Sequence, residues 1–152
     1  MLMDIIKARH SIRKYTDRQI DRSDLEKILE AGNYAPKEQP STIDDPTIQN
    51  GFYGAPTVVC VFCQDNFLFK VADAFCMMEN MVLQATELGI ASCIISRGPE
   101  TFASEEGRAL LRAWEVPDGY VCQGFVILGY IDGEQPHTKT RKPGRIKIVE
   151  SY

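Results

Sequence analysis

Apolar residues recur along this chain with two different periods, one typical of helices and the other of buried strands. Helical spacing predicts four helices, over residues 3–9, 23–34, 73–88 and 99–114. Uninterrupted apolar runs predict buried strands over residues 57–63, 90–95 and 120–131, with a further short strand at 146–149. The order of these elements indicates a layered α+β domain.

The second helix is expected to begin with a capping box, in which Ser23 bonds an unpaired backbone amide and Glu26 reaches back. After this helix, residues 37–54 are mostly polar and contain Pro40 and Pro46. Their composition predicts a loop with at most one helical turn. No strand is expected in this part of the chain.

The helix predicted over residues 73–88 is apolar around most of its circumference. Its apolar side chains are Phe75, Met77, Met78, Met81, Val82, Leu83, Ala85 and Leu88. Such a helix must be buried, either in a core or against a partner. Because the preceding loop supplies no strand to cover it, the pattern favours a homodimer in which this helix packs against its two-fold copy.

The composition is that of an ordinary globular protein, with 44% apolar and 25% charged residues in a chain of 152. No apolar run approaches the roughly 18 residues that a membrane helix needs, and no export signal is recognisable at the N-terminus. We therefore expect one domain over residues 1–152, located in the cytoplasm without membrane contact. The net charge of −4 gives no support to nucleic-acid binding.

Five cysteines lie in apolar surroundings, at positions 60, 63, 76, 93 and 122. In a reducing compartment the simplest interpretation is that they are buried thiols. The spacing of Cys60 and Cys63 gives only weak support to a metal or redox site, because residues three apart on a strand face opposite sides. We expect no metal.

Basic residues are concentrated near the two ends of the chain. In the segment 9–13, Arg9, Ser11 and Arg13 share one face if the backbone is extended, while Ile12 packs inward. Near the C-terminus, Lys139 and Arg141 alternate in the same way. Two guanidinium groups and a hydroxyl suit a phosphate, although each segment alone could also be a solvated basic stretch. Together, the two segments could converge on one phosphate.

The chain resembles the nitroreductase family, and the resemblance runs through nearly its whole length in order. The matching motifs are Arg9-His10-Ser11-x-Arg13, Tyr15-Thr16, Leu25-x-x-Ile28-Leu29-Glu30-Ala31, Ala35-Pro36, Gly54-Ala55-Pro56-Thr57-Val58-Val59, Asn80-Met81-x-Leu83-x-Ala85-x-x-Leu88-Gly89-Ile90-x-Ser92, Gly129-Tyr130 and Lys139-x-Arg141-x-Pro143. The resemblance implies a three-layer α+β fold with a central, mostly antiparallel sheet flanked by helices. It also implies an FMN-binding homodimer with the flavin at the subunit interface.

The family resemblance further implies an oxidoreductase. Electrons would pass from NAD(P)H to a small acceptor, such as a nitroaromatic compound or a quinone, by ping-pong hydride transfer on FMN. Because the flavin supplies the reactivity and the protein supplies orientation and electrostatics, no catalytic acid or base of the protein is expected.

The resemblance also implies roles for individual residues. Arg9 and Ser11 would hold the phosphate and the ribityl chain of FMN with Lys139 and Arg141, and Arg13 would lie toward the pyrimidine edge. His10 belongs to the same motif but would point away. The backbone of Ser96, Arg97 and Gly98 would approach the flavin near N5, where a glycine permits close contact. Gln39 matches the glutamine of the family's Gln-Pro pair.

After Pro36 the sequence departs from the family pattern, because the segment is short and Ser41 stands where an aromatic residue is usual. This departure leaves the acceptor open. Two alternatives therefore stay open: a flavin-binding or flavin-storing protein without efficient turnover, and a degenerate dimeric scaffold that has lost the flavin.

Overall fold

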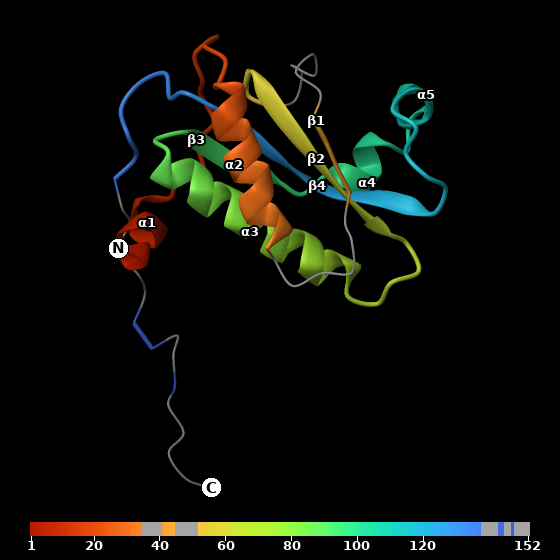
Figure 1. The fold of residues 1–152 in the computed structure, drawn as a ribbon, viewed down its shortest axis with the longest axis horizontal. Coiled ribbons are helices and arrows are strands. Elements are labelled where there is room, and N and C mark those ends of the chain that lie inside the picture. Colours follow the sequence, from red (N-terminus) through yellow and green to blue (C-terminus); the bar gives the residue numbers. More distant parts are fainter. Residues whose placement is uncertain (35–40, 45–51, 138–142, 145–146, 148–152) are drawn as a thin grey trace, which may run out of the picture.

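Four antiparallel strands form the sheet at the centre of the molecule, which we describe from a computed structural model over residues 1–34, 41–44, 52–137, 143–144 and 147 (Figure 1). The strands are β1 (Ser41–Asp44), β2 (Thr57–Gln64), β3 (Ala91–Ile95) and β4 (Tyr120–Gly129). Their order across the sheet is β1-β2-β4-β3, and every neighbouring pair is antiparallel. The long strands β2 and β4 are therefore central.

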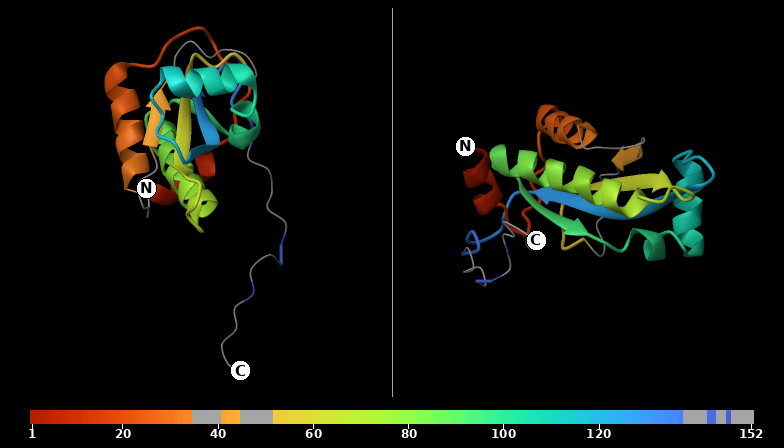
Figure 2. Two further views of the ribbon diagram at one scale, coloured as in Figure 1. Left: turned by 90° about the vertical axis from the view of Figure 1, so that its right-hand side faces the viewer. Right: turned by 90° about the horizontal axis from the view of Figure 1, so that it is seen from below.

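Helices lie on both sides of this sheet, as Figure 2 shows for α2 and α4. The helices are α1 (Leu2–Ala8), α2 (Arg22–Asn33), α3 (Lys70–Glu87), α4 (Gly98–Thr101) and α5 (Glu105–Ala113). Helices α2 and α3 cover one face, where Met77, Met78 and Met81 are fully buried against β2 and β4. The opposite face carries a cluster of aromatic rings around Phe125, with the ring centroid of Phe52 4.9 Å away. The predicted α+β class, with a sheet between helices, is confirmed.

Strand β1 overturns the prediction of a loop for residues 41–44, while residues 52–54 form a turn and residues 37–40 and 45–51 lie outside the described part of the chain. Its residues pair one to one with β2, from Ser41 opposite Phe62 to Asp44 opposite Val59. A strand of four residues has too little apolar pattern to be recognised alone, and it forms because β2 offers it a hydrogen-bonding edge. Pro40 and Pro46 flank it, which an edge strand tolerates. The absence of a strand in this region therefore no longer supports a homodimer.

The predicted capping box of the second helix is also wrong. Helix α2 begins at Arg22 with Asp21 at the N-cap, and no side chain caps it within the described part of the chain. Glu26 instead accepts a hydrogen bond of 3.1 Å from Arg22 Nε, one helical turn before it. The Glu26 carboxylate is therefore engaged in an ion pair along the helix and does not bond a backbone amide at the helix start.

The single helix predicted over residues 99–114 is in fact two. The chain leaves α4 at Thr101 and restarts at Ser104, whose hydroxyl accepts a 2.9 Å hydrogen bond from the amide of Gly107. Glu105 and Glu106 follow in the first turn of α5, where negative charge favours a helix start. Apolar spacing did not reveal this break, although the serine cap is visible in the sequence.

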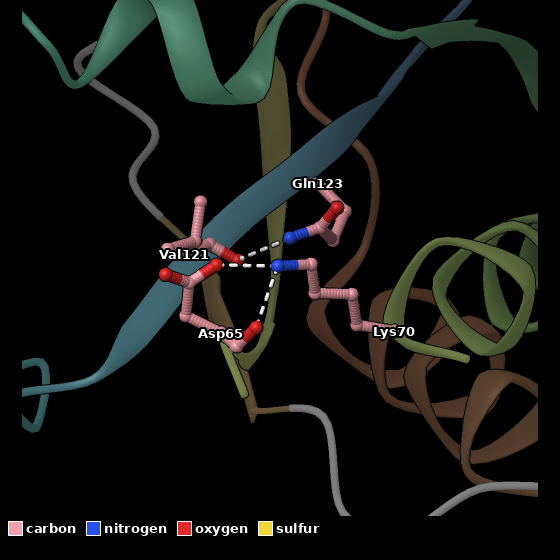
Figure 3. A network of polar contacts seen from close by, with 4 residues as sticks. All are labelled: Asp65, Lys70, Val121 and Gln123. Carbon is pink, nitrogen blue, oxygen red and sulfur yellow. Dashed lines mark hydrogen bonds and ion pairs between the residues drawn. The ribbon is translucent and has the colours of Figure 1, made fainter. Parts of the chain in front are cut away.

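Helix α3 begins at Lys70, three residues before the predicted Asp73, and Lys70 contacts the turn before it. The Lys70 ammonium donates to the backbone oxygen of Asp65 at 2.6 Å and also pairs with the Asp65 carboxylate (Figure 3). On β4, the buried Gln123 donates a 3.1 Å hydrogen bond to the Val121 carbonyl (Figure 3). These polar contacts organise one end of the sheet.

The same helix is amphipathic rather than apolar all round. Its buried residues are Ala74, Met77, Met78, Met81, Val82 and Ala85, and all of them pack in the core of their own subunit. Phe75 is 36% exposed. Within the described residues, the subunit thus covers most of the apolar surface that the sequence suggested a partner must cover.

The thiols are distributed largely as predicted. Cys60 and Cys63 belong to core clusters on opposite faces of the sheet, and Cys93 and Cys122 are also buried. Cys76 is exposed on α3, contrary to the expectation for all five. No helix in the described part of the chain is long and apolar enough to cross a membrane.

Candidate functional site

The basic N-terminal segment runs along the outer edge of the sheet. Ser11 forms a parallel bridge with Ser92 of β3, and the Ile12 amide donates a 2.9 Å hydrogen bond to the Ser92 carbonyl. Farther along, Tyr15 pairs with Ile131, just after β4. The segment is therefore held at both ends by the sheet, with the residues between Ser11 and Tyr15 fixed at its edge.

Side chains alternate along this segment as an extended backbone requires. Ile12 is buried, with 4% of its surface exposed, whereas Ser11 and Arg13 are exposed. His10 and Ile12 line a cavity of about 350 Å³ that also borders Ser92. Arg9, Ser11 and Arg13 do not line it. His10 thus borders this cavity together with Ile12, apart from its basic neighbours.

Arg9 stands where α1 ends and faces α3. Its Nε lies 3.9 Å from the Glu79 Oε1, and the two side chains are 27% and 50% exposed. An ion pair of that length at a partly exposed position contributes little to stability. The Arg9 guanidinium can therefore exchange this carboxylate for an anion such as a phosphate at small cost.

Arg13 lies beside an aromatic ring from a distant part of the chain. Its guanidinium carbon is 5.9 Å from the centroid of the Tyr53 ring, within the range of a cation–π contact. Tyr53 is 50% exposed and precedes β2. Tertiary structure thus gives Arg13 a neighbour that leaves its positive charge intact.

Ser96, Arg97 and Gly98 follow directly from the C-terminal end of β3. Ser11 pairs in parallel with Ser92 of β3, whereas after Ile12 the segment runs beside the residues that follow β4, since the Asp132 amide donates to the Lys14 carbonyl and Tyr15 pairs with Ile131. Ser96 and Arg97 are exposed and Gly98 is buried. The structure therefore places Ser11 beside Ser92 of β3, and Ser96, Arg97 and Gly98 continue from the C-terminal end of the same strand.

Gly98 has a structural reason to be glycine. A Cβ atom there would lie 2.6 Å from the carbonyl oxygen of Cys122 and 2.7 Å from the amide nitrogen of Gly124. Real Cβ atoms essentially never come so close to a backbone atom. A glycine at this position is therefore required by its packing against β4.

Three predicted site residues, Gln39, Lys139 and Arg141, lie outside the described residues. Three others enter the neighbourhood that the sequence did not single out for chemistry: Tyr15, Tyr53 and Glu79. Glu79 carries no local signal of its position. Tyr53 carries none either, because its positive φ is visible only in the folded backbone.

An antiparallel sheet between helices, with a basic segment bridged to its edge strand β3, defines the class of this protein as a layered α+β fold. The chain belongs to the nitroreductase family, because the model described as "Nitroreductase family" matches residues 6–42 and 37–130. The resemblance drawn from the sequence motifs is confirmed.

Individual relatives agree with this assignment. A protein of Archaeoglobus fulgidus described as a "Putative NADH dehydrogenase/NAD(P)H nitroreductase" is 32% identical, and the match covers 88% of this chain and 87% of that protein. A nitroreductase of Bacteroides fragilis, solved with bound FMN, is 33% identical with a TM-score of 0.89, and the match covers 98% of each chain. An FMN-bound nitroreductase of Desulfitobacterium hafniense shares the fold, with a TM-score of 0.86 at 22% identity and 98% coverage of each chain.

Proposed function

We propose that this nitroreductase-family oxidoreductase binds FMN at the edge of β3 and passes electrons from NAD(P)H to a small acceptor such as a nitroaromatic compound or a quinone. The observation that carries the proposal is the basic segment Arg9–Arg13, which is fixed to β3 by the bridge between Ser11 and Ser92 and by the hydrogen bond from the Ile12 amide to the Ser92 carbonyl. The Bacteroides fragilis nitroreductase, which covers 98% of this chain at 33% identity, has bound FMN and supports the same assignment.

The residues present fit a flavin phosphate. Arg9 is partly buried and its carboxylate neighbour Glu79 is 3.9 Å away, so the guanidinium is positioned without being strongly neutralised. Ser11, two residues farther along the extended segment, is exposed, and its hydroxyl can donate a hydrogen bond. A guanidinium and a hydroxyl on a backbone held by β3 provide charge and hydrogen bonds for a phosphate at little ordering cost.

Within this proposal each residue has a distinct task. Arg9 and Ser11 hold the phosphate and the ribityl chain together with Lys139 and Arg141, and Arg13 places positive charge at the pyrimidine edge. The backbone at Ser96, Arg97 and Gly98 borders the ring near N5, and Gln39 adds a polar contact. When bound, FMN supplies ping-pong hydride transfer between NAD(P)H and the acceptor. The protein orients both and contributes no essential acid or base.

We also propose that the active form is a homodimer with the flavin at the subunit interface. On helix α1, Leu2, Met3 and Ile6 are 65%, 55% and 42% exposed. Beside it, a groove of about 460 Å³ is lined by Leu2, Ile5 and Leu83 among others. An apolar surface of this kind is typical of a protein interface. Because Arg9 directly follows α1, a second copy packed on α1 would border the flavin.

The absorption spectrum of freshly purified protein, followed by titration of apoprotein with FMN and an NAD(P)H oxidation assay, tests the proposal. Flavin bands with turnover are the expected result. Tight FMN binding without NAD(P)H oxidation would instead indicate a flavin-storing protein. A colourless protein that cannot be loaded with FMN would indicate the scaffold alternative.

The phosphate site is tested by Arg9→Ala. A charge-assisted contact contributes about 1.5–3 kcal/mol, so the dissociation constant for FMN should rise about tenfold or more. Affinity for riboflavin, which lacks the phosphate, should change little. Lys14→Ala is the matched control, because it removes a positive charge from the same segment but Lys14 pairs with Asp132 at 2.9 Å. Equal losses for FMN and riboflavin would contradict the assignment of Arg9.

A further inference from the structure

The turn before β2 contains a residue in an unfavourable backbone conformation. Tyr53 has a φ of +56° and Gly54 a φ of +72°, and the Ala55 amide donates a 3.0 Å hydrogen bond to the Phe52 carbonyl. Two positive φ values inside such a hydrogen bond are typical of a type I′ turn. Asn, Asp and Gly are favoured at the first central position, where a bulky side chain is strained.

The strain at Tyr53 is not explained by burial of its side chain. Phe52 and Ala55, on either side of the two central residues, are 5% and 0% exposed and anchor the turn in the core. Tyr53 is 50% exposed, and its ring instead faces the Arg13 guanidinium at 5.9 Å. Strained residues that persist in a fold are concentrated at functional sites.

We infer that Tyr53 is a positioning residue that holds the Arg13 guanidinium in the direction needed at the flavin ring, an inference that rests on the proposed function. An exposed arginine has many rotamers, and a ring beside the guanidinium restricts them through cation–π attraction. An aromatic ring also differs from a carboxylate such as Glu79, since it orients a cation without neutralising it. Arg13 therefore keeps its full attraction for negative charge at the pyrimidine edge.

The substitution Tyr53→Asn separates the two effects of the residue. It places the favoured Asn-Gly pair in the turn, so the melting temperature of the apoprotein should rise by about 2–4 °C. Removal of the ring frees Arg13, so the dissociation constant for FMN should rise about twofold to fivefold, the size expected of an exposed cation–π contact. A residue with a merely structural role would not move stability and affinity in opposite directions.

Tyr53→Phe and Glu115→Gly are the matched variants. Tyr53→Phe keeps both the ring and the strained backbone, so it should retain the wild-type melting temperature and the wild-type affinity for FMN. Glu115 also has a positive φ, of +54°, at the C-terminal end of α5. Glu115→Gly should therefore raise the melting temperature and leave the affinity for FMN unchanged.

Two further measurements test whether Tyr53 acts through Arg13 and whether it affects binding of the flavin ring rather than of the phosphate. In an Arg13→Ala background, Tyr53→Asn should no longer weaken FMN binding, because the group that it positions is gone. The loss caused by Tyr53→Asn should also be the same for riboflavin as for FMN, unlike the loss caused by Arg9→Ala.

The inference alone is overturned if wild-type protein binds flavin and Tyr53→Asn binds it equally well. It is also overturned if Tyr53→Asn lowers the melting temperature, or if Tyr53→Phe binds as poorly as Tyr53→Asn. Wild-type protein that binds no flavin at all would overturn the proposed function, and this inference with it.

Discussion

The phenol of Tyr15 donates a 2.8 Å hydrogen bond to the carbonyl oxygen of Ile12, three residues earlier. That carbonyl belongs to the peptide bond between Ile12 and Arg13, so the bond orients the backbone from which the Arg13 side chain departs. Tyr15 is 8% exposed. Burial raises the pKa of its phenol far above the ordinary value of 10.0, and Cys93 adds to the rise, so the proton remains available for the bond in neutral solution.

Tyr15→Phe should remove this bond while keeping the ring in place. We expect the free energy of unfolding to fall by about 1–3 kcal/mol, because a buried carbonyl loses its donor. Urea denaturation measures the change. Tyr120→Phe, at a half-buried tyrosine on β4, is the control and should cost less than about 1 kcal/mol. An unchanged stability for Tyr15→Phe would show that the bond contributes nothing net.

Gly98→Ala should destabilise the protein whether or not flavin is present. The new methyl group would meet the Cys122 carbonyl at 2.6 Å, and a backbone atom in the central strand cannot move away freely. The cost of such overpacking is about 1–3 kcal/mol, measured as the loss in apoprotein unfolding free energy. Ser96→Ala, at an exposed position nearby, should change it by no more than about 0.5 kcal/mol. An apoprotein of normal stability that binds flavin poorly would instead give Gly98 a role in ligand contact.

Buried thiols should make the protein less stable in alkaline solution. Burial raises the pKa of Cys63 from 9.0 to about 11 and that of Cys122 from 9.0 to about 12. Above pH 9 the unfolded chain therefore releases thiol protons that the folded protein keeps, so the free energy of unfolding falls as the pH rises. Each thiol contributes at most about 1.4 kcal/mol per pH unit within that window.

Urea denaturation from pH 7 to pH 11 measures this effect. Below pH 9 both thiols are protonated in both states, so their contribution should be constant. Cys122→Ala should show a shallower fall above pH 9, although its stability at pH 7 is lower because a buried side chain is truncated. A steeper fall in that variant would contradict the attribution to Cys122.

The homodimer proposal predicts that Ile6→Asp separates the subunits. Ile6 is 42% exposed on α1, so a charge there is tolerated in a monomer but should be disfavoured in an apolar interface. Light scattering should report half the native mass, and FMN should be released because the proposed site is shared. Leu110→Asp, at a leucine 36% exposed on α5, is the control and should leave mass and flavin unchanged.

A native mass for Ile6→Asp would place the interface elsewhere. Met81→Asp would be a poor test of the same idea, although the apolar pattern of α3 suggests it. Met81 is fully buried within its own subunit, where its side chain packs against Gly32. A charge at that position would unfold the subunit itself.

The features that local pattern determines were predicted well. Strands β2 and β4 and helix α3 carry enough apolar residues to be recognised within a single window, because each buries a long stretch of its own sequence. Alternation along the N-terminal segment likewise predicted an inward Ile12 between outward-facing Ser11 and Arg13, since an extended backbone fixes the direction of successive side chains.

Tertiary structure decided what depends on contacts between distant residues. Strand β1 exists because the edge of β2 pairs with it, and its four residues carry no sufficient pattern of their own. Packing against α2 and the sheet determines which face of α3 is buried within the subunit, so this face needs no partner. Arg13 meets Tyr53, and Arg9 meets Glu79, only after the chain has folded back on itself. A sequence motif can specify which groups are charged, but the neighbours that orient a charge come from other elements and are fixed only by packing.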